Sequence, residues 1–286
     1  MRVFPSVDAL LASGERIDLA SLAVPTSLHA EVGVRLLNAG WNLLVEKPLA
    51  ASLTEADALI AAARDKGLVL QPGHLERFNP AVMAVEPMVR SPRFFEVHRL
   101  SVFSPRALDV DVVLDLMIHD LDIVLRLAES PVRELRAVGI PILSRKVDIA
   151  NVRLEFESGC VANLTASRVS TERVRKLRFF QLSEYISLDY ARRDLLRIGL
   201  NPAAAANLSA MDAAKLDAAN LPPGLHLEKP VIAAGEPLRL EIESFIAAVR
   251  NGTRPHVSAE EGRAALALAL EIHRTMAEHA VRAGLA

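Results

Sequence analysis

The stretch Val45-Glu46-Lys47-Pro48 ends a short apolar segment with a carboxylate, an amine and a proline. Upstream, the apolar segment 19–24 runs into Pro25-Thr26-Ser27-Leu28-His29 and then into an Ala/Leu-rich helical pattern. Strand, loop and helix therefore alternate twice, which is the repeating unit of a parallel sheet. Ligands of such sheets bind beyond the carboxyl ends of the strands, where both loops fall. Lys47 is thus placed for chemistry, although a surface lysine at a helix start explains this pattern about equally well.

Residues 1–75 continue this alternation. Apolar spacing predicts helices at 27–38 and 52–66. Leu68-Val69-Leu70 predicts a short buried strand that Pro72-Gly73 closes. From about residue 93 onward, apolar and polar residues alternate instead, as they do in half-buried antiparallel strands. Such strands are expected at 94–103, 150–156, 161–167 and 174–188, followed by amphipathic helices at 240–250 and 259–281, with an Ala/Asn/Asp-rich arm at 201–224.

A second chemical feature is a predicted helix at 111–127. Its polar residues are spaced four, four, three and four apart, so they form one stripe, and nearly all other positions are apolar. The pattern predicts a helix buried on most sides, with the stripe facing a polar cavity. A simpler interpretation is a cap at the first aspartate, an i,i+4 ion pair at the end and a hydrogen-bonded core histidine. The stripe consists of Asp111, Asp115, His119, Asp122 and Arg126.

Several short motifs, in order along the chain, resemble those of the Gfo/Idh/MocA family of nicotinamide-dependent sugar oxidoreductases. Each motif alone is weak, but the ordered set, spread from about residue 20 to about residue 275, is specific. The form of residues 73–80 is most similar to the branch that oxidises UDP-N-acetylglucosamine at C3, with inositol-type and other nucleotide-sugar members close to it. The motifs are Ala23 to His29, Ala39-Gly40, Val45 to Pro48, Gly73-His74-Leu75-Glu76-Arg77-Phe78-Asn79-Pro80, Asp115 to Asp122, and Val257 to Gly262.

The resemblance implies an α/β fold with a truncated Rossmann-type parallel sheet, followed by an α+β domain with an open, mainly antiparallel sheet. We place the partial dinucleotide-binding domain at 1–78. The substrate-binding and oligomerisation domain follows at 79–286, with C-terminal helices packing back on the first domain. A partly apolar outer face of the open sheet favours a homo-oligomer, a dimer or tetramer. The residues expected on that face are Phe94, Val97, Phe179, Leu182 and Tyr185.

One departure from the family concerns the cofactor turn. Family members begin with a strand, a Gly-x-Gly-x-x-Gly turn that holds the cofactor pyrophosphate, and a helix. No two glycines of this chain are separated by one residue. Residues 1–12 resemble the end of the family's third strand and the helix after it. We therefore expect either a start codon placed too far downstream or a truncated gene, with a non-catalytic sugar-nucleotide-binding or assembly protein as the alternative function.

The chemistry of alcohol oxidation explains why Lys47, Asp115 and His119 belong together. A hydride must leave carbon while the hydroxyl loses its proton, and histidine has a suitable pKa for the base. An ammonium group beside the same oxygen stabilises the developing alkoxide. The resemblance implies these roles for Lys47 and His119, with Asp115 in support. Which of the first two takes the proton stays open.

The remaining site residues follow from their positions and from the resemblance. The cofactor is expected to be NAD or NADP, and the substrate a small sugar or nucleotide sugar. The family also leads us to expect an unusual Lys47–Pro48 peptide, for which the cis form is accessible at low cost. Asn79 is equally explained as a helix cap. The expected cofactor contacts are Pro25, Thr26, His29, Glu46, Lys47 and Pro48, and the expected substrate contacts are Arg77, Asn79, Asp115, His119 and Arg168.

Composition excludes several classes of protein. A net charge of −2 gives no reason to expect a nucleic-acid partner or an anionic membrane. The chain has neither a signal-peptide pattern nor an apolar run of about 20 residues, so we expect a cytoplasmic protein. Cys160 is its single cysteine, which excludes an intrachain disulfide and predicts a small core residue. The histidines lack metal-ligand spacing, and no serine lies in a Gly-x-Ser-x-Gly elbow, so neither a metal nor a serine hydrolase is expected.

Overall fold

The structure is a computed structural model that describes residues 2–104, 110–201 and 224–285. Two compact units make up the chain. The first comprises Met1–Phe78 and Glu236–Leu270, and the second comprises Asn79–Gly235 and Glu271–Ala286. Residues 202–223 of the arm expected from the sequence lie outside the described residues.

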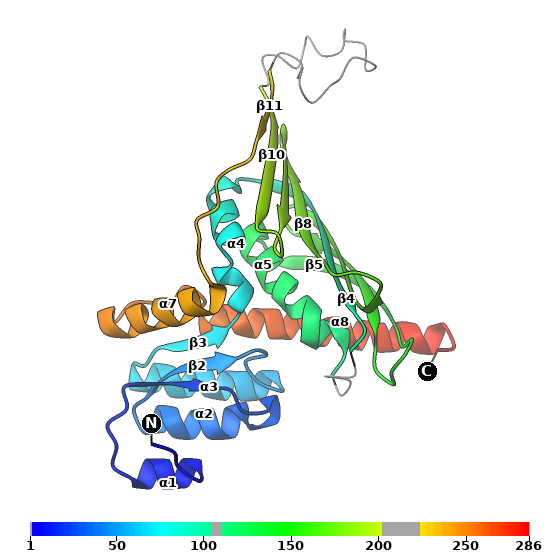
Figure 1. Ribbon diagram of the computed structural model, residues 1–286. Helices are drawn as coiled ribbons and strands as arrows, with labels where there is room; N and C mark the ends of the chain where they lie inside the picture. The colour runs from blue at the N-terminus through cyan, green and yellow to red at the C-terminus, as the bar shows by residue number, and fades with distance from the viewer. Residues whose placement is uncertain (1, 105–109, 202–223, 286) are drawn as a thin grey trace. The chain divides into compact units, whose positions relative to one another are not determined.

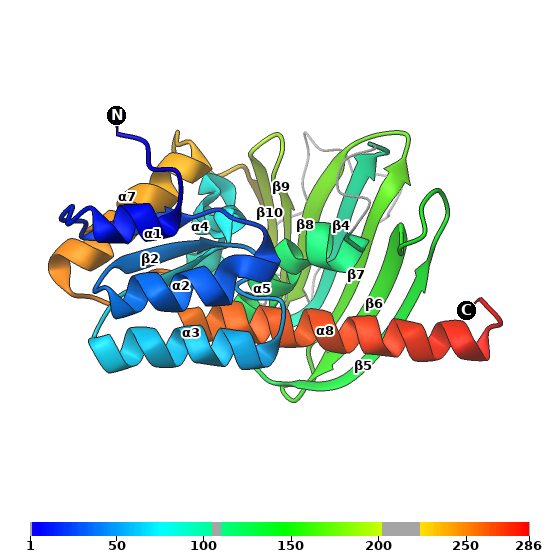
Figure 2. The same ribbon diagram turned by 90° about the horizontal axis from the view of Figure 1, so that it is seen from below.

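The first unit is built on three parallel strands in the order β1-β2-β3 (Figure 1). Helices α2 and α3 pack side by side, and α2 also packs on β2 (Figures 1 and 2). The strands are β1 (Leu19–Leu22), β2 (Asn42–Glu46) and β3 (Leu70–Gly73). The helical elements are α1 (Val7–Ala12), η1 (Thr26–Leu28), α2 (His29–Asn38), α3 (Leu53–Lys66), η2 (Leu75–Phe78), α7 (Pro237–Asn251) and the first part of α8 (Ala259–Arg282).

Local sequence signals explain most of these elements. Ser52 caps α3 by accepting a hydrogen bond from the Glu55 amide. The strand predicted at 68–70 lies further along the chain in the structure, where β3 begins at Leu70 and includes Pro72 and Gly73. Proline is tolerated there because β3 is an outer strand of the described sheet, and a missing N–H costs little at an edge.

The second unit is built on an eight-stranded sheet in the order β11-β10-β9-β8-β4-β7-β6-β5. All neighbouring pairs are antiparallel except β4 and β7, which are parallel. The two sheets confirm the predicted fold class. The strands are β4 (Pro92–Val102), β5 (Val132–Ile140), β6 (Ile149–Phe156), β7 (Val161–Ser170), β8 (Val174–Gln181), β9 (Glu184–Asp189), β10 (Asp194–Leu200) and β11 (Leu225–Glu228).

Helical elements cover one face of this sheet. The π-helical turn η4 (Val113–Met117) packs on β7, α5 (Ile118–Ala128) packs on β4, and α4 (Pro80–Val85) packs on β9 and β10. A short 3-10 turn, η3 (Glu86–Met88), follows α4. Apolar side chains of the strands are buried on this face, where Cys160 is also fully buried, as expected.

The structure corrects three expectations in this unit. The strand expected at 174–188 is the hairpin of β8 and β9, which turns at Ser183 with φ of 61° and no glycine. The helix expected at 111–127 begins as a π turn. Val97 and Phe179 are buried in the core, so they do not belong to the outer face of the sheet. Their strands alternate the other way, placing Phe94 and Phe180 together in register.

Candidate active site

The loops after β1 and β2 lie side by side because these strands are parallel neighbours, with Leu22 in register with Val45. Pro25 and Thr26 form the start of η1, and Glu46 ends β2. Lys47 follows Glu46 directly and is half-buried. The Lys47–Pro48 peptide is cis, which confirms the expectation from the family resemblance. This edge of the first unit therefore carries a hydroxyl, a carboxylate and an amine in close sequence proximity to the strand ends.

His29 connects these two loops. Its Nδ1 lies 3.0 Å from the Pro48 carbonyl oxygen and its Nε2 lies 2.9 Å from the Val24 carbonyl oxygen. The side chain is 1% exposed. Both ring nitrogens thus face backbone oxygens of the loops, so the imidazole holds the loop of Lys47 against the loop after β1.

A buried glutamate that the sequence analysis did not identify lies near Glu46. Glu241 of α7 is 1% exposed, and its Oε1 has no hydrogen-bond partner. Burial, with the Glu46 carboxylate in addition, raises the pKa of Glu241 to about 8. Gly73 packs closely on Glu46, because a Cβ at Gly73 would lie 3.2 Å from both Cα and Oε2 of Glu46. An amphipathic pattern alone did not show that this glutamate lies on the buried side of its helix.

Arg77 is also buried, at 1% exposure. Its Nη2 donates to Oε1 of Glu261, at 3.4 Å. Glu261 in turn accepts a hydrogen bond from the Ser258 amide, and the Ser258 hydroxyl accepts one from the Glu261 amide, which is a capping box at the start of α8. Arg77 therefore joins η2 to α8 within the first unit. Gly262 allows this close approach, because a Cβ there would lie 2.4 Å from Cγ of Pro72.

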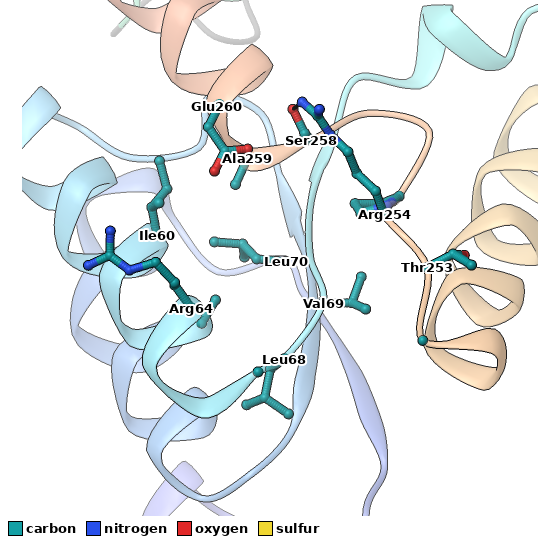
Figure 3. Close-up of a pocket in the computed structure, with 14 residues that line it drawn as sticks. Ile60, Arg64, Leu68, Val69, Leu70, Thr253, Arg254, Ser258, Ala259 and Glu260 are labelled. Carbon is teal, nitrogen blue, oxygen red and sulfur yellow. Dashed lines mark hydrogen bonds between the residues drawn. The ribbon is translucent and has the colours of Figure 1, made fainter.

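A hollow of about 590 Å³ in the first unit lies elsewhere (Figure 3). Residues 68–70, at the amino end of β3, line it together with the end of α3, the end of α7 and the start of α8. Arg64 and Arg254 stand on opposite sides of the hollow (Figure 3). Because the loops of Pro25 and Lys47 follow the carboxyl ends of the strands, this hollow is not the candidate active site.

In the second unit, Asp115 and His119 stand four residues apart where η4 passes into α5. Both are partly exposed, whereas most apolar residues around them are buried. Asp111 caps η4 by accepting hydrogen bonds from the amides of Val113 and Leu114, at 2.8 and 3.1 Å. A π turn often occurs at functional sites, and this one contains Asp115 and directly precedes His119.

The two remaining residues of the stripe, Asp122 and Arg126, lie in α5. Arg126 contacts Glu86 at 3.6 Å and Glu129 at 3.9 Å. Asp122 is buried, at 3% exposure.

Asn79, expected as a substrate contact or a cap, caps α4 through the Ala81 amide and donates to the Tyr190 carbonyl.

Arg168 is 5% exposed and is held within the second unit. Its Nε donates to Oδ1 of Asp148 at 2.7 Å, and its Nη1 donates to the Val110 carbonyl at 2.7 Å. Burial alone would raise the pKa of Asp148, but hydrogen bonds from Arg168, Ser144 and backbone amides hold it far below its usual range. A second buried pair, Arg99 with Asp120, was not identified from sequence, because nothing in the local pattern joins strand 92–102 to the helix.

The residues at the first unit's strand ends suit a nicotinamide dinucleotide. Gly73 keeps the surface beside Glu46 free of a side chain that would crowd the carboxylate. Thr26, Glu46 and Lys47 carry a hydroxyl, a carboxylate and an amine, which are groups able to hydrogen-bond ribose hydroxyls and a carboxamide. Among the described residues, no group of three or more His, Cys, Asp or Glu side chains could hold a metal ion. No helix in the described ranges is long and apolar enough to cross a membrane.

A parallel sheet of this type followed by an open antiparallel sheet defines a class of NAD-binding oxidoreductases, and comparisons with known proteins agree. Residues 1–74 match the family model described as "Oxidoreductase family, NAD-binding Rossmann fold", and residues 85–180 match the GFO/IDH/MocA C-terminal domain. The chain belongs to the Gfo/Idh/MocA oxidoreductase family.

Two curated relatives match nearly the whole chain. UDP-N-acetylglucosamine 3-dehydrogenase of Acidithiobacillus ferrooxidans is 37% identical over 95% of this chain and 82% of its own. Inositol 2-dehydrogenase of Rhizobium meliloti is 29% identical over 96% of this chain and 82% of its own.

Solved structures show the same fold. A structure of the Acidithiobacillus ferrooxidans enzyme superposes with a TM-score of 0.85 at 37% identity, covering 96% of this chain and 82% of that chain. Levoglucosan dehydrogenase in complex with NADH and levoglucosan superposes with a TM-score of 0.80 at 18% identity, over 96% of this chain and 82% of that chain.

Proposed function

We propose that the protein oxidises a secondary hydroxyl of a nucleotide sugar with NAD or NADP, and that UDP-N-acetylglucosamine, oxidised at C3, is the substrate. The observation that carries this proposal is the 37% identity to a UDP-N-acetylglucosamine 3-dehydrogenase over 95% of the chain. The aligned region spans both the parallel-sheet unit and the open-sheet unit, which supports a shared reaction rather than a shared cofactor fold alone.

Lys47, His119 and Asp115 are the proposed catalytic residues. A bound nicotinamide cofactor would supply the hydride acceptor, and the residues of this chain act on the hydroxyl proton. One of Lys47 and His119 takes the hydroxyl proton, and the other stabilises the oxygen as its negative charge develops. Asp115, one turn before His119, orients the imidazole or holds a neighbouring sugar hydroxyl.

The remaining residues bind the cofactor or support those that react. Pro25, Thr26, Glu46 and Pro48 form the cofactor side of the site in this proposal. His29 stabilises the two loops that carry these residues, because both of its ring nitrogens contact carbonyl oxygens of the loops. Three residues expected at the substrate are engaged within their own units and act as supports, namely Arg77, Asn79 and Arg168.

The test is oxidation of a substrate panel followed at 340 nm with NAD⁺ and with NADP⁺. UDP-N-acetylglucosamine is compared with UDP-glucose, UDP-N-acetylgalactosamine and myo-inositol. We expect UDP-N-acetylglucosamine to have the highest kcat/KM, and NMR of the product to show a ketone at C3. A higher kcat/KM for myo-inositol, or a ketone at another carbon, would contradict the proposed substrate or position.

A second candidate function is sugar-nucleotide binding without turnover. In this alternative the chain binds the sugar nucleotide but transfers no hydride. Calorimetric titration with UDP-N-acetylglucosamine, with and without NAD⁺, separates the two candidates. Tight sugar-nucleotide binding without NADH formation favours the binding protein, whereas NADH formation favours the dehydrogenase.

We also propose that the outer face of the eight-stranded sheet joins two copies of the chain. Phe180 is 38% exposed there and packs against Phe94 and Tyr185, with ring centroids 5.7 and 5.1 Å apart. Leu182, in the turn of the same hairpin, is 87% exposed. Light scattering after gel filtration should show a dimer or tetramer, and Phe180→Glu should shift it toward the monomer. A monomeric wild-type protein would refute this proposal.

A further inference from the structure

We propose that two buried arginines of the second unit, Arg99 and Arg168, are positioning residues that hold the helix of Asp115 and His119 in its reactive placement. This inference rests on the proposed function, because it concerns the same catalytic pair. In this proposal Arg168 holds the helix in place and does not bind the substrate. The proposal also assigns a role to Arg99, which no sequence motif indicated.

Both arginines extend from the same face of two adjacent strands. Strands β4 and β7 are the parallel pair of the sheet, and Arg99 is in register with Ala166. Arg168 lies beside a register irregularity between β4 and β7, and its hydrogen bond to the Val110 carbonyl shows that it reaches the face covered by the helix. That face packs against η4 and α5, and the arginines are 2% and 5% exposed. Two neighbouring strands therefore each direct one guanidinium toward the helix.

Arg168 holds the segment that leads into the helix. Its Nη1 donates to the Val110 carbonyl at 2.7 Å, and the Val112 amide donates to the Val147 carbonyl at 3.1 Å. These two contacts lie on either side of Asp111, the residue that caps η4. The start of the helix is thus joined to β7 and to the loop between β5 and β6.

The Arg168 side chain is itself rigidly held. Its Nε donates to Asp148, which is 0% exposed, at 2.7 Å. Oδ2 of Asp148 accepts hydrogen bonds from the amides of residues 142, 143 and 144, at 2.7, 2.6 and 2.8 Å. Nη2 of Arg168 also donates to the Ser144 hydroxyl at 3.0 Å. The guanidinium is thus hydrogen-bonded to a carboxylate, a hydroxyl and a backbone carbonyl, which together fix its position.

Arg99 holds the helix on the other side of the reactive pair. Its Nε and Nη2 donate to the two carboxylate oxygens of Asp120, at 2.7 and 2.9 Å. The guanidinium also lies 5.4 Å from the ring centroid of Tyr190. Asp120 directly follows His119, so this planar, bidentate contact restrains both the translation and the rotation of the helix there.

The placement of the two contacts explains why charged groups are buried at this point. A buried ion pair is often no more stabilising than apolar side chains of the same volume, because both charges lose their hydration. Directional hydrogen bonds, however, fix a helix in one position along its axis, which apolar packing does less strictly. A displacement of about 1 Å at a catalytic group can reduce a rate about 100-fold. The contacts at Val110 and Asp120 enclose Asp115 and His119 and would prevent such a displacement.

The test compares Arg168→Met and Arg99→Met with Arg197→Met as the matched control. Arg197 also forms ion pairs in this unit, with Glu184 and Glu228, but it is partly exposed and lies on β10, away from the helix. We expect kcat to fall about 10–100-fold in the first two variants, with KM within about 3-fold of the wild type. Arg168→Lys, which keeps one charged donor, should recover part of the rate. The control should keep its kcat.

A double variant separates positioning from a direct role. If Arg168 acts through His119, then His119→Ala with Arg168→Met should be little slower than His119→Ala alone. A KM that rises about 10-fold with unchanged kcat would mean that Arg168 binds the substrate, and would overturn the proposal. An equal loss of kcat in Arg197→Met would also overturn it, because general destabilisation would then explain the effect.

A readout without substrate keeps this inference distinct from the proposed function. Hydrogen exchange of the amides at 110–122 should become faster in Arg168→Met and Arg99→Met, and should stay unchanged in Arg197→Met. If the methionine variants do not fold, Arg168→Lys and Arg99→Lys replace them in the same measurement. Unchanged exchange at 110–122 in folded variants overturns the inference even if the enzyme oxidises the proposed sugar. Faster exchange supports it even if that substrate is wrong.

Discussion

In the first unit Lys47 follows a strand directly, and the buried His29 contacts a carbonyl oxygen of the Lys47 loop and another of the loop after β1. In the second unit Asp115 and His119 lie on a helix that is joined to the sheet through Arg99 and Arg168. The first arrangement depends on short loops between parallel strands, and the second depends on charged contacts between distant segments. The protein therefore places its candidate catalytic groups in two ways, by short loops in the first unit and by buried ion pairs in the second. We expect mutations of the two kinds of contact to have different effects.

The largest expected effect is the loss of a reacting group from either unit. Lys47→Ala and His119→Ala should each lower kcat by about 10²–10⁴-fold, with a smaller change in cofactor affinity, because each removes a proton-transfer or charge-stabilising group. Steady-state kinetics with UDP-N-acetylglucosamine measures this. Lys66→Ala and His98→Ala, at exposed or half-exposed positions, are the matched controls. A loss below 10-fold in both site variants would contradict their catalytic roles.

The next effect concerns stability of the first unit as a function of pH. The folded chain raises the pKa of Glu241 from 4.5 to about 8, so between these values the folded state keeps a proton that the unfolded state has lost. Wild-type stability should therefore decrease as the pH rises through this window. Glu241→Gln removes the ionisable group and should raise the free energy of unfolding by about 3 kcal/mol at pH 7.5, with no gain at pH 4.

Urea unfolding at pH 4, 6 and 7.5 measures the Glu241 effect. The stabilisation should grow continuously across the three values. Glu243→Gln, at an exposed position of the same helix, is the control and should show no comparable trend. A gain that is independent of pH would mean that packing, and not ionisation, separates the variant from the wild type.

His29→Leu tests whether the imidazole contacts stabilise the Lys47 loop. The change leaves the carbonyl oxygens of Val24 and Pro48 without their imidazole contacts, so we expect a loss of about 2 kcal/mol in stability. Hydrogen exchange should become faster in the loops at 24–28 and 47–51 and stay unchanged at 110–122. Faster exchange in the second unit as well would show that the two means of support are not independent.

The smallest effect is expected for Asp115→Asn. The amide keeps the shape of the side chain and one hydrogen-bonding oxygen but removes the charge, so kcat should fall by about 10-fold, less than for His119→Ala. The pH dependence of kcat should shift if Asp115 orients the imidazole. An unchanged pH profile together with a raised KM would assign Asp115 to a sugar hydroxyl instead.

Sequence patterns predicted the local features of both units well. The alternation of β1, α2, β2 and α3 follows from short-range apolar spacing and from caps such as Ser52. The Asp111 cap on η4 was likewise expected, because capping depends only on a side chain and the amides two or three residues later. Features of this kind involve neighbours along the chain.

Features that join distant segments were not predicted. The hairpin at Ser183 lacks the glycine or asparagine that usually marks a turn, so the sequence pattern predicts one strand where the structure has β8 and β9. Strands β5, β10 and β11 were not recognised either. The contacts of Arg168 to Asp148 and Val110, which span 20 and 58 residues of sequence, are not predicted by any local pattern. Such contacts depend on the order of strands in the sheet, which apolar periodicity does not specify.

By itself, the sequence determined the two kinds of sheet, the loops after β1 and β2, and the Lys47, Asp115 and His119 motifs, because each rests on spacing within a few residues. Only the tertiary structure decided that His29 contacts two loop carbonyls, that Glu241 is buried near Glu46, and that arginines from β4 and β7 hold one helix. These features arise when burial removes water from polar groups. A buried group must then find its partner wherever the fold brings one, and the distance between the two along the chain plays no part in that choice.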